Sequence, residues 1–444
     1  MNTRSFSFMA SAALAIAPVP AAAAADQATV PVAATQAVSL PTMGAVTAFY
    51  NRWKTQPLWF QGNVPTAAAN QLPNLLRRSA FEGLGSGPEM ALQVEAAIRQ
   101  AASGNPAAVQ QAERALSAAW VLYVQTIRRP TPGMAYAYDT LKPQGTSADQ
   151  ILLAATSVPN FAQHMLKVSN VNPIYQSIRD AAWNEAQATG NFNPDPRVLA
   201  NLARVRSLPD SGRWVLVDAG SQRLTMFENG QPVDSMKVIV GEDKPELRTP
   251  LLASYMYYVT LNPYWNAPDH LARNIAKVYL KQGKGYLNWR GYEVMSDWTT
   301  EASAIAPEKV DWKGIANGTK EVRIRQKPGE HNFMGTMKFP FANPNDIYLH
   351  DTPTRELFDK STRTLSNGCV RLEDAERFGR WLLGREPSTT SKEAEQHVQL
   401  ARGVPIYVTY ITAQAKDGKL TYLKDVYGWD QPGAMQQLAS RQTP

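Results

Sequence analysis

The sequence is poor in the residues that usually build disulfide frameworks and metal sites. It contains one cysteine, Cys369, and five histidines in 444 residues. A single cysteine cannot form an internal disulfide, and the sequence has neither an HExxH motif nor a paired cysteine spacing. It also has no GxSxG, no P-loop and no complete GxGxxG, the usual signatures of serine hydrolases and nucleotide-binding proteins. We therefore expect no metal and no cofactor.

Long apolar runs are absent as well, apart from a short one near the N-terminus. The first 25 residues contain one positive charge at Arg4, an apolar stretch interrupted by Pro18 and Pro20, and a run of alanines. This order predicts a secretory signal peptide over residues 1–25, and the apolar stretch is too short to cross a bilayer. We expect a periplasmic protein with no transmembrane segment.

The balance of charge narrows the class of partner. Lys and Arg number 45 against 38 Asp and Glu, a formal net charge of +7 with no dense basic run. This distribution indicates either a solvated cationic surface or attraction to an anionic polymer such as a cell wall. Nucleic acid is not an expected partner of an exported protein.

The character of the chain changes near its middle. Residues 26–42 read as a flexible tether, and 43–203 show apolar residues at the three-and-four spacing of helices. Residues 204–425 have strand character, including a hairpin with an Asn-Gly turn, and are interrupted by an insertion over 267–327. Residues 426–444 read as a C-terminal tail. The predicted fold class is α+β, a helical N-terminal domain followed by a mostly β domain.

The lone cysteine lies in the stretch SNGCVR, nineteen residues after His350 at the end of the apolar run DIYLH. Cys369 is either a buried structural thiol or a nucleophile. A nearby imidazole can accept the thiol proton or hold the thiolate as an ion pair, and the ends of two adjacent strands would bring the two side chains together. Gly368 allows a tight backbone approach, so that the Gly368 and Cys369 N–H groups could form an oxyanion pocket.

Arg371 lies on the same face as Cys369 if CVR is extended. Its charge would favour the thiolate or bind a substrate carboxylate. The alternative is an ion pair with Glu373 or Asp374.

At this point the residues resemble a known family. His-Asp-Thr-Pro, a spacer and Ser-x-Gly-Cys-Val-Arg are similar to the L,D-transpeptidases with a YkuD-type catalytic domain. The stretches KVIVGEDKPELRTP and LNPYWNAPDHLA resemble further segments of that domain. FYNRWKTQPLWF and LSAAWVLY resemble the helical scaffold of the long Gram-negative, YcbB-like members. The resemblance covers about 43–425 and implies a scaffold domain before a catalytic domain whose insertion forms a capping subdomain.

The resemblance implies a role for each residue that matches the motif. Cys369 is the nucleophile and His350 the general base, with the imidazole oriented by the backbone carbonyl of Asp351. Gly368 belongs to the oxyanion pocket, and Tyr348 lies near it unless it is a buried strand aromatic.

The same resemblance implies a set of substrate contacts, which we assign to Tyr348, Arg371, Asn367, Ser366 and Trp265. Asn367 departs from the family, which usually has histidine there, and an amide cannot titrate. Trp265 either lines the substrate groove or belongs to a packed aromatic corner.

The implied reaction is a two-step acyl transfer between peptidoglycan stem peptides. A tetrapeptide donor forms a cysteine thioester and releases D-alanine, and the side-chain amine of a diaminopimelate acceptor then gives a 3→3 cross-link. Carbapenem-type β-lactams are the expected inhibitors. The alternatives are transfer to water, to a free D-amino acid or to a lipoprotein lysine, cleavage of such an attachment, and a non-catalytic wall-binding protein on the same fold.

The remaining histidines are expected to be structural. His331 lies in a loop near the active block and is assigned to solvent rather than to substrate contact. His164, His270 and His397 are assigned to helical contexts in which they cap, pack or face solvent.

Overall fold

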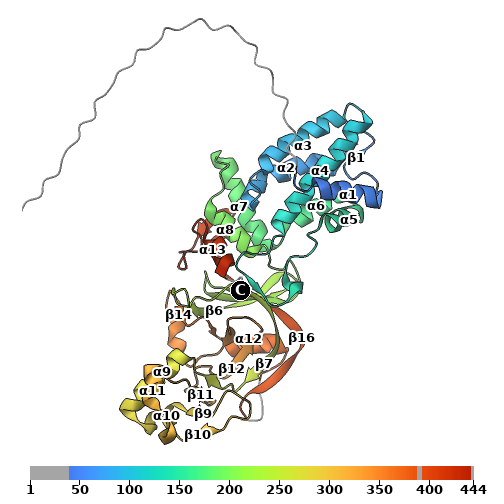
Figure 1. The fold of residues 1–444 in the computed structure, drawn as a ribbon. Helices are drawn as coiled ribbons and strands as arrows, with labels where there is room; N and C mark the ends of the chain where they lie inside the picture. The colour runs from blue at the N-terminus through green and yellow to red at the C-terminus, as the bar shows by residue number, and fades with distance from the viewer. Residues whose placement is uncertain (1–39, 388–392, 442–444) are drawn as a thin grey trace, which may run out of the picture. The chain divides into compact units, whose positions relative to one another are not determined.

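Helices dominate the first half of the chain and strands the second, which confirms the α+β class (Figure 1). The computed structural model describes residues 40–387 and 393–441. The predicted signal peptide, and all but the last three residues of the predicted tether, lie outside the described residues. Within the described ranges, no helix combines the length and apolar character that a bilayer crossing requires.

The helical region begins at Met43 and ends at Val205. Its helices start where the sequence supplies caps: Asn105 and Asn172 each accept a hydrogen bond from the first turn and precede a proline at the first helical position. The apolar faces of α1 to α6 meet in one buried cluster that includes Trp59 and Trp120. The eight helices are α1 Met43–Trp53, α2 Ala67–Arg78, α3 Gly87–Ala101, α4 Pro106–Ile127, α5 Ala148–Thr156, α6 Phe161–Asn170, α7 Pro173–Thr189 and α8 Pro196–Val205.

The β region is built on one large sheet that closes on itself. The strand order is β12-β13-β15-β6-β5-β4-β16-β7-β3, and β12 also pairs with β7. The ends of β5 and β6 are joined by the expected Asn229-Gly230 turn, in which both residues have positive φ. The strands are β3 Ala135–Tyr136, β4 Trp214–Asp218, β5 Arg223–Glu228, β6 Gln231–Gly241, β7 Leu252–Leu261, β12 Met337–Pro340, β13 Tyr348–His350, β14 Thr364–Ser366, β15 Val370–Leu372 and β16 Gln396–Thr409. Strand β14 pairs with β6 beside this path, and α12 Ala375–Leu383 packs on the same core.

The predicted insertion forms a small layer with its own core. Its four strands pair in the order β10-β9-β11-β8, and buried side chains such as Trp312 and Ile324 pack between them and the helices. The elements are β8 Trp265–Asn266, α9 Asp269–Gln282, α10 Lys284–Arg290, β9 Tyr292–Met295, β10 Ala304–Ile305, α11 Trp312–Asn317 and β11 Arg323–Gln326.

Short elements complete the described chain. These are the hairpins β1 Phe60–Gln61 with β2 Val64–Pro65 and β17 Ala413–Lys416 with β18 Lys419–Tyr422, the helix α13 Ala434–Arg441, and the 3-10 turns Ser79–Glu82, Asp139–Leu141, Pro307–Lys309 and Arg355–Asp359. Tyr427 and Trp429 are buried against the β core, so packed structure continues past residue 425, where we predicted that the tail begins.

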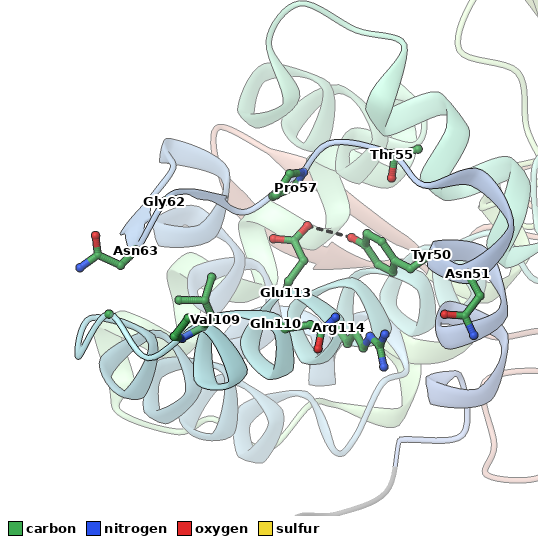
Figure 2. A pocket seen from close by; sticks show the side chains of 12 residues that line it. Tyr50, Asn51, Thr55, Pro57, Gly62, Asn63, Val109, Gln110, Glu113 and Arg114 are labelled. Carbon is green, nitrogen blue, oxygen red and sulfur yellow. Dashed lines mark hydrogen bonds between the residues drawn. The ribbon is translucent and has the colours of Figure 1, made fainter.

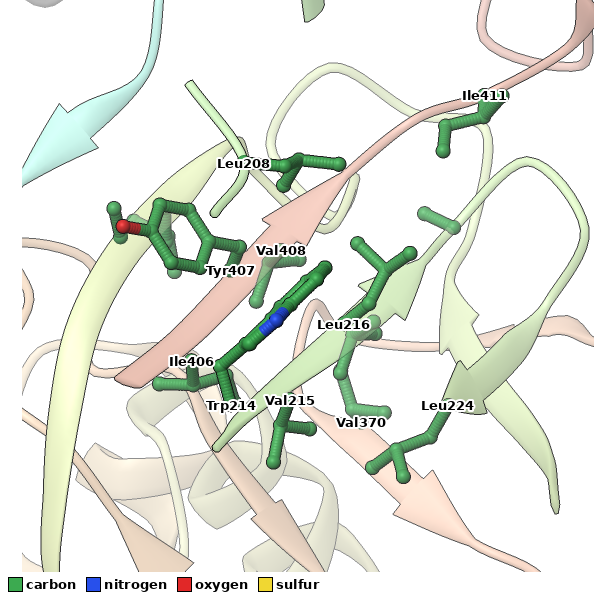
Figure 3. Close-up of a cluster of buried hydrophobic side chains, with 14 of the residues drawn as sticks. Leu208, Trp214, Val215, Leu216, Leu224, Val370, Ile406, Tyr407, Val408 and Ile411 are labelled. Carbon is green, nitrogen blue, oxygen red and sulfur yellow. The ribbon is translucent and has the colours of Figure 1, made fainter. Parts of the chain in front are cut away.

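The core of the β region fixes the strands that lead to the motif residues. Figure 3 shows Trp214 and Leu216 of β4, Tyr407 of β16 and Val370 of β15 in this cluster. Trp214 stacks on Phe227 with ring centroids 4.0 Å apart. Because Val370 is fully buried here, the residue before it, Cys369, is held at a defined edge of the core.

Candidate active site

Two neighbouring strands bring the motif residues onto one face. Strands β13 and β15 are parallel, with Leu349 opposite Val370 and His350 opposite Arg371. Leu349 and Val370 are fully buried. Because side chains alternate along a strand, the residues on either side of this pair face the opposite way.

The four residues that face away from the core line one cavity. Tyr348, His350, Cys369 and Arg371 all border a cleft of about 960 Å³. The strand register therefore unites the predicted nucleophile and the predicted base in one cavity, although nineteen residues separate them in the chain.

The backbone of the next residue orients the His350 imidazole. His350 Nδ1 lies 2.5 Å from the carbonyl oxygen of Asp351. A carbonyl only accepts hydrogen bonds, so Nδ1 carries the proton in the neutral ring and Nε2 is the nitrogen that can take one up. This is the geometry that the sequence resemblance implies for Asp351.

The surroundings of His350 disfavour its charged form. Burial lowers the pKa of His350 to about 3, and the positive charges of Arg371 and Lys338 act in the same direction. Hydrogen bonding to the backbone of Asp351 and Phe333 acts in the opposite direction and is outweighed. The imidazole is therefore neutral near pH 7.

The Cys369 thiol is partly exposed to the cleft. Its Sγ donates to the Asp346 carbonyl across 3.8 Å. Burial raises the pKa of the thiol, whereas hydrogen bonds from the backbone and hydroxyl of Tyr348 and the charges of Lys338 and Arg371 act to lower it. With His350 neutral and the thiol pKa raised, the unliganded cleft holds a neutral thiol and a neutral imidazole. Of the two arrangements that the sequence left open, proton acceptance during attack fits this cleft better than a standing ion pair.

The turn before Cys369 is organised by the hydroxyl of Ser366. This Oγ donates to the Cys369 carbonyl at 2.6 Å and accepts from the Gly368 N–H at 3.2 Å. Gly368 has φ +111°, a conformation that other residues rarely adopt. The Gly368 N–H is thus occupied, so our expectation that it donates to an oxyanion is not met here. Gly368 instead shapes the turn, and its carbonyl accepts a hydrogen bond from Thr249 Oγ1 at 2.8 Å.

A second set of contacts anchors the other side of the site. The buried Asp351 carboxylate accepts from Thr336 N at 2.9 Å and Thr336 Oγ1 at 3.1 Å, and pairs with Arg355 at 2.5 Å. A Cβ at Gly335 would overlap with this carboxylate. Asp351 is therefore fixed by its side chain while its backbone carbonyl meets His350.

Arg371 does not form the ion pair that we considered as its alternative role. Glu373 pairs with Lys237 at 3.6 Å, and Asp374 accepts from Arg377 N at 2.9 Å to cap α12. Among the described residues, no carboxylate lies within ion-pair distance of Arg371. Its guanidinium lines the cleft and is available to an anionic group of a ligand.

The insertion supplies the opposite wall of the cleft. Trp265 packs in the core of the insertion, where its side chain is 7% exposed, and it also borders the cavity. His270, which we assigned to capping, packing or solvent, borders the same cavity, and its Nε2 lies 3.4 Å from Asn367 Nδ2. An imidazole from the insertion thus contacts the position where the family usually has histidine. Sequence reasoning missed it because no local pattern connects residues 97 positions apart.

The other histidines lie away from this cavity. His397 was wrongly placed in a helix and belongs to β16, where its Nδ1 lies 3.0 Å from Thr260 Oγ1. His331 lies in a turn with its ring 5.1 Å from that of Trp289. Within the described residues, no cluster of three or more His, Cys, Asp or Glu side chains is arranged to hold a metal ion.

Comparison with known proteins identifies two domain families along the chain. Residues 212–408 match the family model of the YkuD L,D-transpeptidase catalytic domain, and residues 44–181 match that of the Scaffold domain. A Haemophilus influenzae protein named "Putative L,D-transpeptidase" is 25% identical over 390 residues, which span 86% of this chain and 77% of that protein.

Two solved structures give weaker matches. An L,D-transpeptidase from Mycobacterium smegmatis is 13% identical, with 45% of this chain and 59% of that chain covered and a TM-score of 0.22. An L,D-transpeptidase (residues 123–326) from Xylanimonas cellulosilytica is 14% identical, with 52% and 79% covered and a TM-score of 0.19. The two domain models together span most of the chain, and on them we conclude that it belongs to the L,D-transpeptidase family, with a YkuD catalytic domain preceded by a Scaffold domain.

Proposed function

We propose that this protein forms 3→3 cross-links between peptidoglycan stem peptides through a thioester on Cys369. The observation that carries the proposal is the shared cavity of Cys369, which directly precedes β15, and an oriented, neutral His350 at the end of the adjacent strand β13. The family match supports the reaction class, and the chemistry of the cleft supports the assignment of the steps.

The first step is acylation. The Cys369 thiol transfers its proton to His350 Nε2 as the sulfur attacks the carbonyl carbon of the third stem residue. The Cys369 N–H and the Tyr348 hydroxyl stabilise the oxyanion. The C–N bond to the terminal D-alanine then breaks, the leaving amine takes the proton from His350, and a thioester remains.

The second step is transfer to an acceptor. The side-chain amine of a diaminopimelate on another stem attacks the thioester carbon, and its excess proton passes to His350 Nε2. The C–S bond breaks and the thiolate recovers the proton from His350. Each step is balanced without a redox partner, a nucleotide or a metal.

We assign donor recognition to a ring of polar groups around the thiol. Arg371, a half-buried cation without a carboxylate partner among the described residues, would bind a carboxylate of the donor stem. Trp265 and Asn367 border the same cleft and would contact the stem backbone. Ser366 also borders the cleft, where it would contact the stem, and it organises the turn before Cys369.

We also propose that the protein acts in the periplasm after export by its N-terminal segment. The order of charged, apolar and alanine-rich residues in the first 25 positions supports this. Because the acyl carrier would be a thiol, carbapenem-type β-lactams should acylate the same sulfur.

The test is incubation of the purified chain with disaccharide tetrapeptides, followed by mass spectrometry. We expect D-alanine release and a 3→3 linked dimer, and neither product with Cys369→Ala. Since the chain has one cysteine, a carbapenem adduct that forms on the intact protein and is absent from Cys369→Ala is assigned to that thiol.

The alternative functions correspond to other results of the same assay. A tripeptide without dimer indicates a carboxypeptidase, and an exchanged terminal residue indicates D-amino-acid exchange. Attachment or release of a lipoprotein peptide indicates that acceptor. Binding of tetrapeptide with no product and no carbapenem adduct would leave a wall-binding protein on this fold and would overturn the proposal.

A further inference from the structure

The scaffold domain contains a second groove, separate from the catalytic cleft. It has a volume of about 750 Å³ and lies between the connector after α1 and the first three turns of α4 (Figure 2). A groove of this size is comparable to the sites that hold small peptides and drug-sized ligands. None of the residues that line it lines the catalytic cleft.

The groove is held open by a buried carboxylate at its floor. Glu113 is 6% exposed and accepts from Leu58 N at 2.6 Å, Trp59 N at 3.1 Å and the Tyr50 hydroxyl at 2.8 Å. Trp59 is also bound through its indole N–H to Ser117 Oγ at 2.8 Å. These contacts fix the connector on α4, so the groove exists before any ligand enters, which lowers the entropy that binding must offset.

The charge in the groove favours an anionic ligand. Arg114 lines it and, among the described residues, has no carboxylate within ion-pair distance. Among the described residues, Glu113 is the only acidic one that lines the groove, and three donors already satisfy it. Pro106, the first residue of α4, lines the other end, where the helix presents its positive pole.

The spacing of these two features gives the length of the ligand. Pro106 and Arg114 are eight positions apart in α4, about 12 Å at roughly 1.5 Å per residue. An extended peptide spans this distance in about four residues. Between the two ends lie the Gln110 amide, which can bond to peptide groups, and the apolar side chains of Val109 and Pro57.

A sugar chain fits the lining less well than a peptide does. Saccharide sites commonly offer an exposed aromatic face, and within the described part of the chain Tyr50 is the one aromatic residue that lines this groove. Its hydroxyl is bound to Glu113 and Ser117, and its ring packs edge-on against Phe49 at 5.4 Å. The lining thus favours amide and carboxylate groups over sugar rings.

We propose that this groove binds an acidic, extended peptide of about four residues, which we identify with an uncross-linked stem peptide of the wall. That identification rests on the proposed function of the catalytic domain. A stem held by the scaffold domain would keep the chain attached to its polymer and raise the local concentration of stems at the catalytic cleft. The groove is thus a wall-attachment site carried by the scaffold domain itself.

The test is calorimetric titration of a synthetic stem tetrapeptide into the full chain carrying Cys369→Ala, which prevents turnover. We expect two tetrapeptides per chain, one in each site. Adding Arg114→Glu should weaken the groove site at least tenfold and leave a single site, and Arg114→Gln should give a smaller loss. The matched control is Arg99→Glu, the same charge reversal at an exposed arginine of α3 outside the groove, which should keep both sites.

Circular dichroism and urea unfolding of each variant verify that the fold is retained. The comparison is between Cys369→Ala alone and Cys369→Ala with Arg114→Glu. If both proteins bind one tetrapeptide, or both bind two, the proposal is overturned. Binding of a chitotetraose probe that Arg114→Glu abolishes would also overturn it, in favour of a glycan site. Turnover of soluble tetrapeptide by Arg114→Glu with Cys369 intact separates the two proposals, because loss of the groove should leave that activity unchanged.

Discussion

Acidification should destabilise the native protein through His350, and the effect follows from the burial of its ring. In the unfolded chain this histidine has the ordinary pKa of 6.5, whereas in the native structure burial lowers its pKa to about 3. Between these values the unfolded state binds a proton that the native state excludes. Stability is therefore complete above pH 6.5 and falls as the pH drops below it, by about 1.4 kcal/mol per pH unit.

The magnitude is large enough to measure. From pH 7 to pH 5 the unchanged chain should lose about 2 kcal/mol through this residue alone. Other groups also titrate in this range, so the relevant quantity is the difference between the unchanged chain and His350→Gln. Glutamine does not titrate, and the stability difference between the two chains should shift by about 2 kcal/mol over this interval in favour of the variant.

Urea unfolding of both chains at pH 7, 6 and 5 gives the free energies. With five histidines in the chain, NMR of labelled imidazoles can follow each ring directly. The His350 ring should stay neutral throughout. A protonation midpoint near 6.5, or a stability difference that is flat with pH, would refute the electrostatic description of the site.

Four further changes test the site. Gly368→Ala should destabilise the protein by about 1–3 kcal/mol and slow acylation, because φ is +111° and the new Cβ would crowd Ile347. The control is Gly384→Ala, at a helix end with φ +67° and open space, which should cost about 1 kcal/mol and leave acylation unchanged. Equal effects at the two glycines would contradict this explanation. Thr249→Val should cost about 1–3 kcal/mol in urea unfolding, since it removes the partner of the Gly241 N–H and the Gly368 carbonyl, both buried; a loss under 0.5 kcal/mol would refute the anchoring role. Arg371→Gln should raise KM for tetrapeptide more than it lowers kcat in a steady-state assay, and an unchanged KM would remove it from donor binding. His270→Ala should change the free energy of unfolding by less than 1 kcal/mol, because the contact between His270 and Asn367 is exposed. The same variant should slow carbapenem acylation severalfold in stopped-flow measurements, and an unchanged rate would make the contact incidental.

Much of the site could be predicted from the local chain. Alternation along DIYLH and CVRL predicts that His350 and Cys369 lie on strand faces opposite to Leu349 and Val370, and the buried pair shows this alternation. The glycine before the cysteine indicated a tight backbone approach, and Gly368 lies in a tight turn with φ +111°. These features depend on residues a few positions apart, which is the range over which sequence patterns carry structural information.

Other features depended on packing between distant segments. His270 reads as an ordinary helical residue, and only the position of the insertion against the motif turn brings it to Asn367. The Arg371 guanidinium lacks the local partner that its neighbours in sequence suggested, because Glu373 and Asp374 are engaged with Lys237 and α12.

The sequence alone therefore determined the order of helical and β regions, the candidate pair Cys369 and His350, and the turn that joins Cys369 to the core, since periodicity, glycine and motif spacing are local properties. The tertiary structure alone decided which groups surround that pair, how far burial shifts the pKa of His350, and that the scaffold domain contains a groove of its own. Solvent exclusion and the meeting of distant side chains arise only when the whole chain packs.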